Sequence, residues 1–202
     1  MNRQNSIIPA LGGHVKDFWN LACFRITHPH SWSKFRQLNA VRRRTNADCL
    51  VETGTYLGNT SMRCSRHFSK VFTIELDDQL FEKARSYLST RGNIECIHGD
   101  ATKELKPILS RDDCKNVVIF LDGHFSSGVT AHGDVPEPAC ELLEELSQFK
   151  EKICGIVVDD FRLFGVEKDW PTKSELLRSA EKEFDGYRLS VHLDQLVIER
   201  LA

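Results

Sequence analysis

The chain has 202 residues, of which 41% are hydrophobic and 28% charged, with only 12 Gly and 6 Pro. This composition indicates one globular domain with a sizeable core and excludes the disordered, fibrous and membrane classes. The formal charge of -2 hides two unlike segments: residues 1–47 carry eight Lys and Arg against the single acid Asp17, whereas the remainder carries 19 basic and 28 acidic residues.

The sequence shows no signal for a compartment other than the cytoplasm. No run approaches the ~18 uncharged apolar residues of a transmembrane helix, and no basic-then-apolar signal opens the chain. The seven cysteines are odd in number and form no CxxC pair, so neither a disulfide framework nor a zinc finger is indicated. We therefore expect a cytoplasmic protein with reduced, mostly buried cysteines and no membrane insertion.

Two helices are predicted in the basic front segment, over 15–24 and 31–44. Apolar residues recur in the second at a spacing of three, opposite a face rich in Lys and Arg: Trp32, Phe35, Leu38 and Val41. No nucleic-acid motif accompanies the arginines at 42–44, and three of them fall short of a lipid-binding polybasic run. We therefore expect residues 1–47 to be a helical extension that caps the rest of the chain or makes a homodimer contact, with no nucleic acid as partner.

From Asp48 onward, short β-branched runs alternate with helical stretches, which is typical of βαβ units in a parallel sheet. The expected strands are 49–55, 71–76, 94–98, 117–122 and 155–159. Helices are expected near 60–69, 79–90, 102–109 and 138–150. Helix 173–184 is followed by strands 187–192 and 196–201, and the tight turn between these strands permits a hairpin but no crossover. The product is a mostly parallel α/β sheet with one antiparallel strand.

The first strand-to-helix turn, ETGTYLGNT over 52–60, is the expected ligand site. Open α/β sheets bind ligands beyond the carboxyl ends of their strands. Gly54 and Gly58 let the backbone approach a ligand closely, and Asn59 or Thr60 is available as the helix N-cap.

Acidic residues near this turn indicate what the ligand is. Glu75 ends the second strand, 21 residues after Gly54, where a carboxylate can accept both hydroxyls of a ribose. Tyr56 stands where a GxGxxG motif has its middle glycine, so a pyrophosphate would meet a side chain there. Glu52 faces the same site and favours a cationic group over a phosphate. The sequence therefore predicts a nucleoside without a diphosphate.

The pattern Glu-x-Gly-x-Tyr-x-Gly after a first strand resembles the motif of the S-adenosylmethionine (SAM)-dependent O-methyltransferases related to catechol and caffeoyl-coenzyme A methyltransferases. Thr-Ile-Glu at 73–75 resembles the family's ribose-binding strand end, and Gly-Asp-Ala at 99–101 resembles its motif beside the adenine. The resemblance implies a Rossmann-like class I methyltransferase fold with seven strands in the order 3-2-1-4-5-7-6, the seventh antiparallel. It also implies SAM as cofactor, bound by Glu52, Gly54, Tyr56, Gly58, Asn59, Thr60, Glu75, Asp100, Ala101 and Asp122.

Two further strands end in acids at the same edge, Asp122 after the fourth and Asp159 with Asp160 after the fifth. Carboxylates this close repel one another unless a cation lies among them, and their hard oxygens suit Mg²⁺, or less selectively Ca²⁺ or Mn²⁺. The pattern also resembles the metal site of these methyltransferases, most closely those of the macrocin and novobiocin sugar O-methyltransferases. That resemblance implies a metal that binds a substrate hydroxyl and lowers its pKa. The alternative is that the acids are caps or solvated loop ends.

His124 and Asp122 are the expected catalytic residues. An imidazole can take a proton from a hydroxyl near neutral pH, so His124 is the predicted base, with a metal ligand or a loop histidine as alternatives. The loop 125–136 is long and is expected to form part of the substrate site. Arg162 is expected to balance the acid pair before it, the alternative being an anionic group of the substrate.

The expected function is metal-assisted methyl transfer from SAM to a hydroxyl of a sugar-like or phenolic small molecule, performed by a methyltransferase domain over 48–202. A binding protein that has lost the chemistry of this fold is one alternative, and a metal-dependent enzyme of another reaction type is a second. The complete set of nucleoside-binding residues argues against both, because neither requires a nucleoside site.

Overall fold

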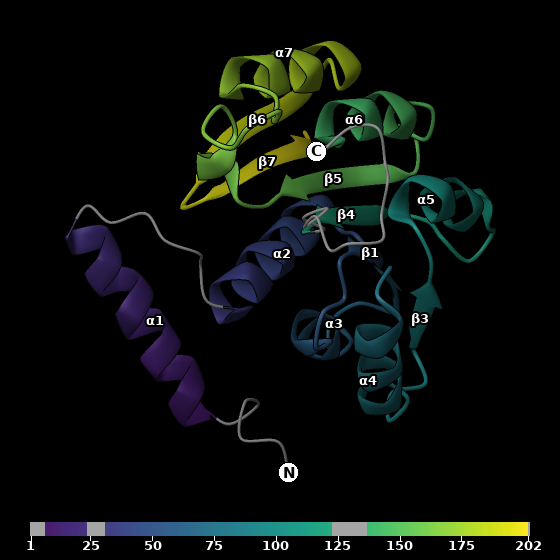
Figure 1. Cartoon of the computed structure of the whole chain (residues 1–202). Coiled ribbons are helices and arrows are strands. Elements are labelled where there is room, and N and C mark those ends of the chain that lie inside the picture. The colour runs from purple at the N-terminus through teal and green to yellow at the C-terminus, as the bar shows by residue number, and fades with distance from the viewer. Residues whose placement is uncertain (1–6, 24–30, 123–136, 202) are drawn as a thin grey trace.

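Seven strands form one sheet in the computed structural model, which describes residues 7–23, 31–122 and 137–201 of the chain (Figure 1). The strands are β1 (Cys49–Thr53), β2 (Lys70–Glu75), β3 (Ile94–His98), β4 (Val117–Leu121), β5 (Ile153–Val158), β6 (Tyr187–His192) and β7 (Gln195–Arg200). Their order is β3-β2-β1-β4-β5-β7-β6, and only the pairs that involve β7 are antiparallel. The predicted strand order, the antiparallel seventh strand and the final hairpin are confirmed.

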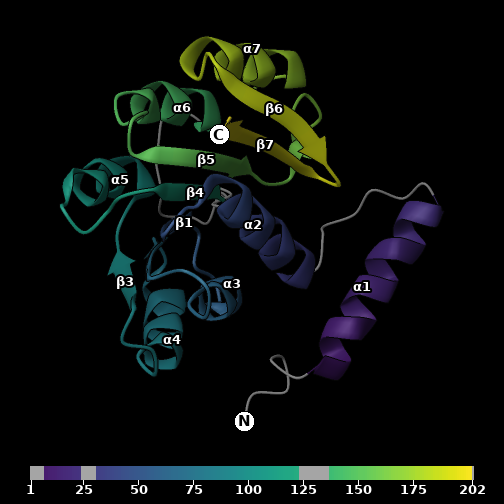
Figure 2. The same cartoon turned by 180° about the vertical axis from the view of Figure 1, so that it is seen from behind.

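Helices cover both faces of this sheet. Their bounds are α1 (Ile7–Ala22), α2 (Ser31–Thr45), α3 (Asn59–Cys64), α4 (Asp78–Leu88), α5 (Ala101–Ser110), α6 (Ala139–Ser147) and α7 (Lys173–Glu183), with a short 3₁₀ helix at Phe161–Leu163. α5, α6 and α7 pack on one face, and α2, α3 and α4 on the other, which Figure 2 shows from behind. α3 is shorter than the predicted 60–69, because the chain turns at His67, whose N–H donates to the carbonyl of Cys64 at 2.8 Å.

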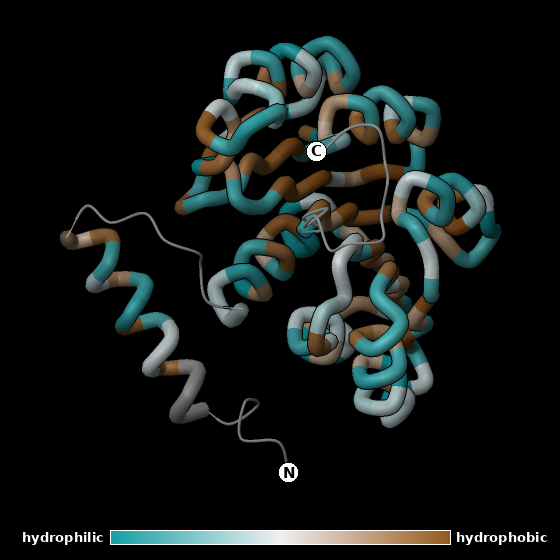
Figure 3. Tube along the Cα trace, in the orientation of Figure 1, coloured by the Kyte–Doolittle hydropathy of each residue, from teal (hydrophilic) through white to brown (hydrophobic). Residues whose placement is uncertain are grey.

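The strands are apolar on both sides, as a sheet covered by two helical layers requires. In β1, Leu50 packs in the core beneath α2 and α3, whereas Cys49 and Val51 pack in the core beneath α5, α6 and α7. Figure 3 shows the same division along the chain: hydrophobic residues concentrate on the strands, and hydrophilic residues lie mostly on the helices.

α2 lies directly on the middle of the sheet. Its side chains Leu38 and Val41 are fully buried. Gly155 of β5 permits this approach, because a Cβ there would lie 2.7 Å from Cγ1 of Val41. At the end of the helix, Arg44 Nη2 lies 2.8 Å from Oε2 of Glu199, a buried acid of β7. α2, the second helix of the basic front segment, is therefore part of the packed core.

α1 stands apart from the sheet (Figure 1). It begins at Ile7, well before the predicted 15–24, and it tolerates Pro9 because the N–H groups of the first turn are not used in helical hydrogen bonds. Several of its apolar side chains are exposed: Leu11, Val15, Phe18, Trp19 and Leu21. Ser33 of α2 contacts α1, donating a hydrogen bond to Asp17. Within the described ranges, no helix combines the length and the apolar character needed to cross a bilayer.

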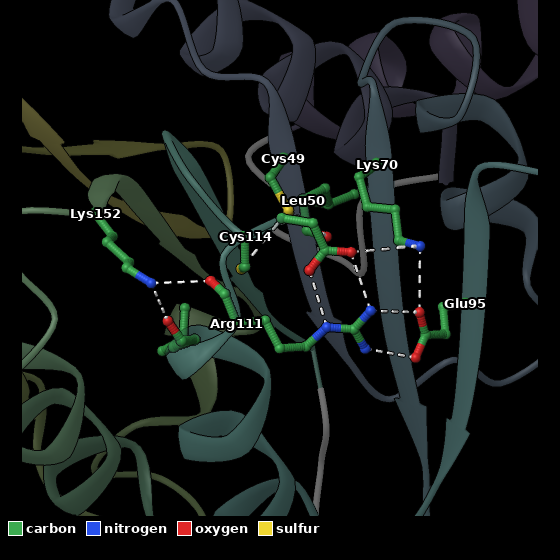
Figure 4. A network of polar contacts seen from close by, with 9 residues as sticks. Cys49, Leu50, Lys70, Glu95, Arg111, Cys114 and Lys152 are labelled. Carbon is green, nitrogen blue, oxygen red and sulfur yellow. Dashed lines mark hydrogen bonds and ion pairs between the residues drawn. The ribbon is translucent and has the colours of Figure 1, made fainter.

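A polar network ties the amino ends of the strands together (Figure 4). Arg111 donates to both carboxylate oxygens of Glu95, at 2.7 and 3.2 Å, and to Asp113 at 2.9 Å. Lys70 Nζ lies 3.2 Å from the same Glu95. All seven cysteines are free thiols. The predicted ligand site lies at the opposite edge, where the strands end.

Candidate active site

The turn between β1 and α3 has the backbone path that its glycines predict. Gly54, Tyr56 and Gly58 have φ values of +79°, +50° and +73°, in the left-handed region that favours glycine. A Cβ at Gly58 would also lie 3.0 Å from the side chain of Leu88. The N–H of Gly54 donates to the carbonyl of Ile74 at 3.0 Å, which lays the turn across the end of β2.

Glu75, at the end of β2, binds this turn directly. One carboxylate oxygen accepts a hydrogen bond from the backbone N–H of Tyr56 at 2.7 Å, and the other accepts from the N–H of Asp77 at 3.0 Å. The Glu75 side chain is buried, whereas the Tyr56 side chain is exposed. The structure thus brings together the turn and the acid that were predicted to meet a nucleoside.

The predicted side-chain N-cap at Asn59 or Thr60 is wrong. α3 begins at Asn59, and its N-cap is Gly58, which has no side chain to offer. Asn59 Oδ1 is instead buried, with no hydrogen-bond partner among the described residues. A buried acceptor without a donor costs about 1–3 kcal/mol. Asn59 Oδ1 therefore fits a ligand that brings a hydrogen-bond donor to the turn.

Glu52 lies on β1, beneath the turn, and does not face an open site. Its Oε2 accepts hydrogen bonds from the hydroxyls of Ser61 at 2.5 Å and Thr73 at 2.8 Å. Burial raises the pKa of Glu52 to about 7, although both hydrogen bonds lower it. The carboxylate therefore joins β1, α3 and β2 from the inside.

Asp100 and Ala101 follow β3 at the same edge of the sheet. Asp100 is the N-cap of α5, and its Oδ1 accepts from the backbone N–H of Thr102 at 3.0 Å. β3 pairs with β2 in a register that sets His98 against Glu75. The three predicted nucleoside-binding segments therefore lie side by side at the ends of β1, β2 and β3.

A lysine bridges the acids at the ends of β4 and β5. Lys34 Nζ, from α2, donates to the two carboxylate oxygens of Asp122 at 2.8 and 3.0 Å and lies 2.5 Å from Oδ2 of Asp159. Burial lowers the pKa of Lys34, but the charges of Asp122 and Asp159 outweigh it and raise this pKa above its ordinary value. Burial and the charge of Asp159 raise the pKa of Asp122, which Lys34 opposes.

Asp160 pairs elsewhere. Its backbone has a φ of +50°, and its Oδ1 lies 2.5 Å from Nη1 of Arg162. Arg162 also pairs with Asp194, in the turn between β6 and β7. The expected balancing role of Arg162 is confirmed for Asp160, whereas the partner of Asp159 is Lys34.

The residues at this edge do not fit the Mg²⁺ site that the sequence predicts. Asp122 and Asp159 hold the Lys34 ammonium, and Asp160 holds Arg162. Across 7–23, 31–122 and 137–201, no three His, Cys, Asp or Glu side chains form a group that could hold a metal. His124 and the predicted substrate loop 125–136 lie outside the described residues.

Lys34 is the main residue that the sequence interpretation missed. The signal for it is its position four residues before Leu38 and seven before Val41, which places it on the buried stripe of α2. A lysine on such a stripe requires a charged partner. Ser61 and Gln195 carry no comparable signal, because nothing in the sequence around them points to the acids that they contact, Glu52 and Asp159.

No protein-family model matches the sequence, and no curated protein is significantly similar to it. Solved structures do match. An O-methyltransferase from Bacillus cereus in complex with SAH (S-adenosylhomocysteine) is 16% identical, with a TM-score of 0.64 over 98% of this chain and 94% of that one. The O-methyltransferase TomG from Streptomyces achromogenes, involved in tomaymycin synthesis and in complex with SAM, is 19% identical, with a TM-score of 0.59 over 96% and 89%. The SAH-bound methyltransferase PaMTH1 from Podospora anserina is 13% identical, with a TM-score of 0.59 over 84% and 78%.

Proposed function

Because the chain has the fold of class I methyltransferases, we propose that it binds SAM and transfers the methyl group to a hydroxyl of a small molecule. The observation that carries the proposal is the junction of the 54–58 turn with Glu75, where a left-handed backbone meets a buried carboxylate at the ends of the first two parallel strands. The unpaired Asn59 Oδ1 at the same turn supports it. The similar structures from Bacillus cereus and Streptomyces achromogenes hold SAH and SAM.

The nucleoside half of the cofactor is assigned to the ends of β2 and β3. Glu75 accepts the ribose hydroxyls, because each of its carboxylate oxygens keeps a second lone pair beside the one that accepts from the backbone of Tyr56 or Asp77. Asp100 and Ala101 lie beside the adenine, one strand further along the edge.

The methionine half is assigned to the turn itself. Gly54 and Gly58 leave its backbone bare, and Asn59 and Thr60 follow at the start of α3. Glu52 positions these residues from below, because its hydrogen bonds to Ser61 and Thr73 fix α3 against β2.

The cofactor supplies a methyl group that its sulfonium already activates, so the chain must orient the acceptor and take up its proton. Asp122 ends β4 beside the turn, since its N–H donates to the carbonyl of Thr53 at 3.3 Å. We assign the orienting role to Asp122 and the role of base to His124. The acceptor is a sugar-like or phenolic hydroxyl. A divalent metal is left out of the proposal, because Lys34 binds two of its predicted ligands.

Calorimetric titration with SAM tests the cofactor site. Wild-type protein is expected to bind, and Glu75→Ala is expected to weaken binding about tenfold or more, equivalent to about 1.4 kcal/mol. The reason is that this change removes both the ribose acceptor and the support of the Tyr56 backbone. Glu82→Ala is the matched control and should bind like wild type, because Glu82 is an exposed acid of α4 that pairs with Arg85.

Unchanged SAM affinity in Glu75→Ala would overturn this assignment.

A second measurement distinguishes an enzyme from a binding protein with the same fold. Formation of SAH with a panel of sugars and phenols supports the enzyme, whereas SAM binding without SAH formation supports the binding protein.

A further inference from the structure

We propose that Lys34 takes the place of a divalent metal in this site, its ammonium being the built-in cation that holds Asp122 and Asp159 together. The inference rests on the proposed methyl transfer for its functional consequence, which is a reaction that needs no metal. The occupancy of the acid pair itself is measurable without cofactor or acceptor.

The geometry around Nζ is that of a filled cation site. Three carboxylate oxygens lie around it, two of Asp122 at 2.8 and 3.0 Å and one of Asp159 at 2.5 Å. The ammonium donates hydrogen bonds to both oxygens of Asp122, and its contact with Oδ2 of Asp159 is an ion pair. The side chains of Lys34 and Asp122 are only 15% and 16% exposed, and that of Asp159 is 0% exposed.

The charges explain why an ammonium is held here. Two carboxylates at one place repel each other unless a cation lies between them. Oδ1 of Asp159 also accepts a hydrogen bond from Nε2 of Gln195 at 2.9 Å, and an amide brings no charge. Removal of the Lys34 charge therefore leaves two buried carboxylates whose mutual repulsion another cation would relieve.

Lys34 is held in place by its helix. Leu38 and Val41 follow on the same stripe of α2 and are fully buried, and the far end of the helix is fixed by the pair of Arg44 with Glu199. The third acid of the predicted metal set is engaged independently, because Asp160 lies 2.5 Å from Arg162. Two separate contacts thus use the oxygens that a divalent metal would need.

Binding of Mn²⁺, followed by the paramagnetic resonance signal of the free ion, tests the proposal. Wild-type protein is expected to leave Mn²⁺ free at millimolar concentration. Lys34→Met keeps the apolar stem and removes the charge, so it should bind one Mn²⁺ about tenfold more tightly than wild type, or better. Lys34→Met with Asp159→Asn should lose this gain, because one carboxylate remains. Lys70→Met, which removes an ammonium beside Glu95 at the opposite edge, is the matched control and should behave like wild type.

Wild-type protein that binds Mn²⁺ and loses it on Asp159→Asn overturns the proposal, because the metal then displaces Lys34. A folded Lys34→Met that binds Mn²⁺ no better than wild type overturns it as well. If circular dichroism shows that Lys34→Met does not fold, Lys34→Arg carries the test: it keeps the positive charge, and it must leave Mn²⁺ free. None of these measurements uses SAM or an acceptor. If the Mn²⁺ test contradicts the Lys34 site, methyl transfer remains possible with a metal. If the SAM titration fails, the Lys34 site is unaffected.

Discussion

The carboxyl group of Glu52 is buried inside the protein. Burial raises its pKa from the ordinary 4.5 to about 7, against the effect of the Ser61 and Thr73 hydroxyls. A carboxyl group with a higher pKa in the folded state binds its proton more tightly there. Its contribution to stability is therefore complete below about pH 4.5 and is lost as the pH rises through about 7.

We therefore expect Glu52→Gln to flatten the pH dependence of stability. Between about pH 5 and about pH 8 the free energy of unfolding of this variant should rise relative to that of wild type, by up to about 3 kcal/mol. Urea unfolding of both proteins at the two pH values measures the difference. Parallel pH profiles would show that Glu52 is not held as a buried neutral acid.

Substitutions at Gly58 and Gly186 distinguish the cost of backbone strain from the cost of side-chain crowding. Both have left-handed φ, +73° and +84°, but a Cβ at Gly58 would lie 3.0 Å from Leu88, whereas a Cβ at Gly186 meets nothing within 4 Å. We expect Gly186→Ala to lower the free energy of unfolding by about 1 kcal/mol through strain alone. Gly58→Ala should lower it by about 1 kcal/mol more, through crowding of Leu88. Denaturant unfolding compares the two, and equal losses would mean that Leu88 gives way without cost.

At the scale of the elements, the position of α2 on the sheet depends on one missing side chain. A Cβ at Gly155 would lie 2.7 Å from Val41 Cγ1 and 3.3 Å from the carbonyl oxygen of Ile198. Gly155→Ala is therefore expected to destabilise the protein by about 1–3 kcal/mol. Val41→Ala removes the crowded methyl group and should recover part of this loss in the double variant.

A double-mutant cycle on the free energy of unfolding measures that recovery. The expected coupling between positions 41 and 155 is about 1 kcal/mol in the stabilising direction. Strictly additive losses would mean that α2 does not press on β5 at this point.

The strands and most helices were predictable because their signals are local. Runs such as Val117–Leu121 are apolar throughout, since both faces of the sheet are covered. The order of the strands is not a local property, and it followed from the family resemblance. Element ends were less predictable: α3 is capped by the backbone of Gly58, and α1 accepts Pro9 in its first turn.

The site was predictable where it consists of one continuous turn and of strand ends. The turn around Gly54 and Gly58 and its partner Glu75 lie together as expected. The predicted metal site was wrong, because the cation between Asp122 and Asp159 is the Lys34 ammonium, which comes from a distant helix. Lys34 precedes Asp122 by 88 residues, and no local spacing relates a helix in the front segment to an acid after the fourth strand.

At the scale of the whole molecule, the two helices of the basic front segment contribute differently. Leu38 of α2 is fully buried, whereas Phe18 and Trp19 of α1 are 72% and 68% exposed. We expect a chain without residues 1–23 to keep its free energy of unfolding within about 1 kcal/mol, whereas Leu38→Ala should cost about 2–5 kcal/mol. Denaturant unfolding measures both.

If the shortened chain were unfolded, α1 would have to be part of the core. The predicted domain boundary at residue 47 stays a prediction, and the unfolding of the shortened chain and of Leu38→Ala tests it. The structure also gives the charge division of the sequence a physical meaning. The positive front segment brings Lys34 to Asp122 and Asp159, and Arg44 to Glu199, so its charges meet acids of the remaining chain.

A crystal structure of the wild-type protein grown with SAH and Mn²⁺, with anomalous data for manganese, would reveal both the cofactor and the cation between the two acids. We expect SAH along the 54–58 turn with its ribose hydroxyls on Glu75, Lys34 between Asp122 and Asp159, and no manganese peak between these acids. An SAH molecule bound away from Glu75, or a manganese ion in the position of the Lys34 ammonium, would contradict it.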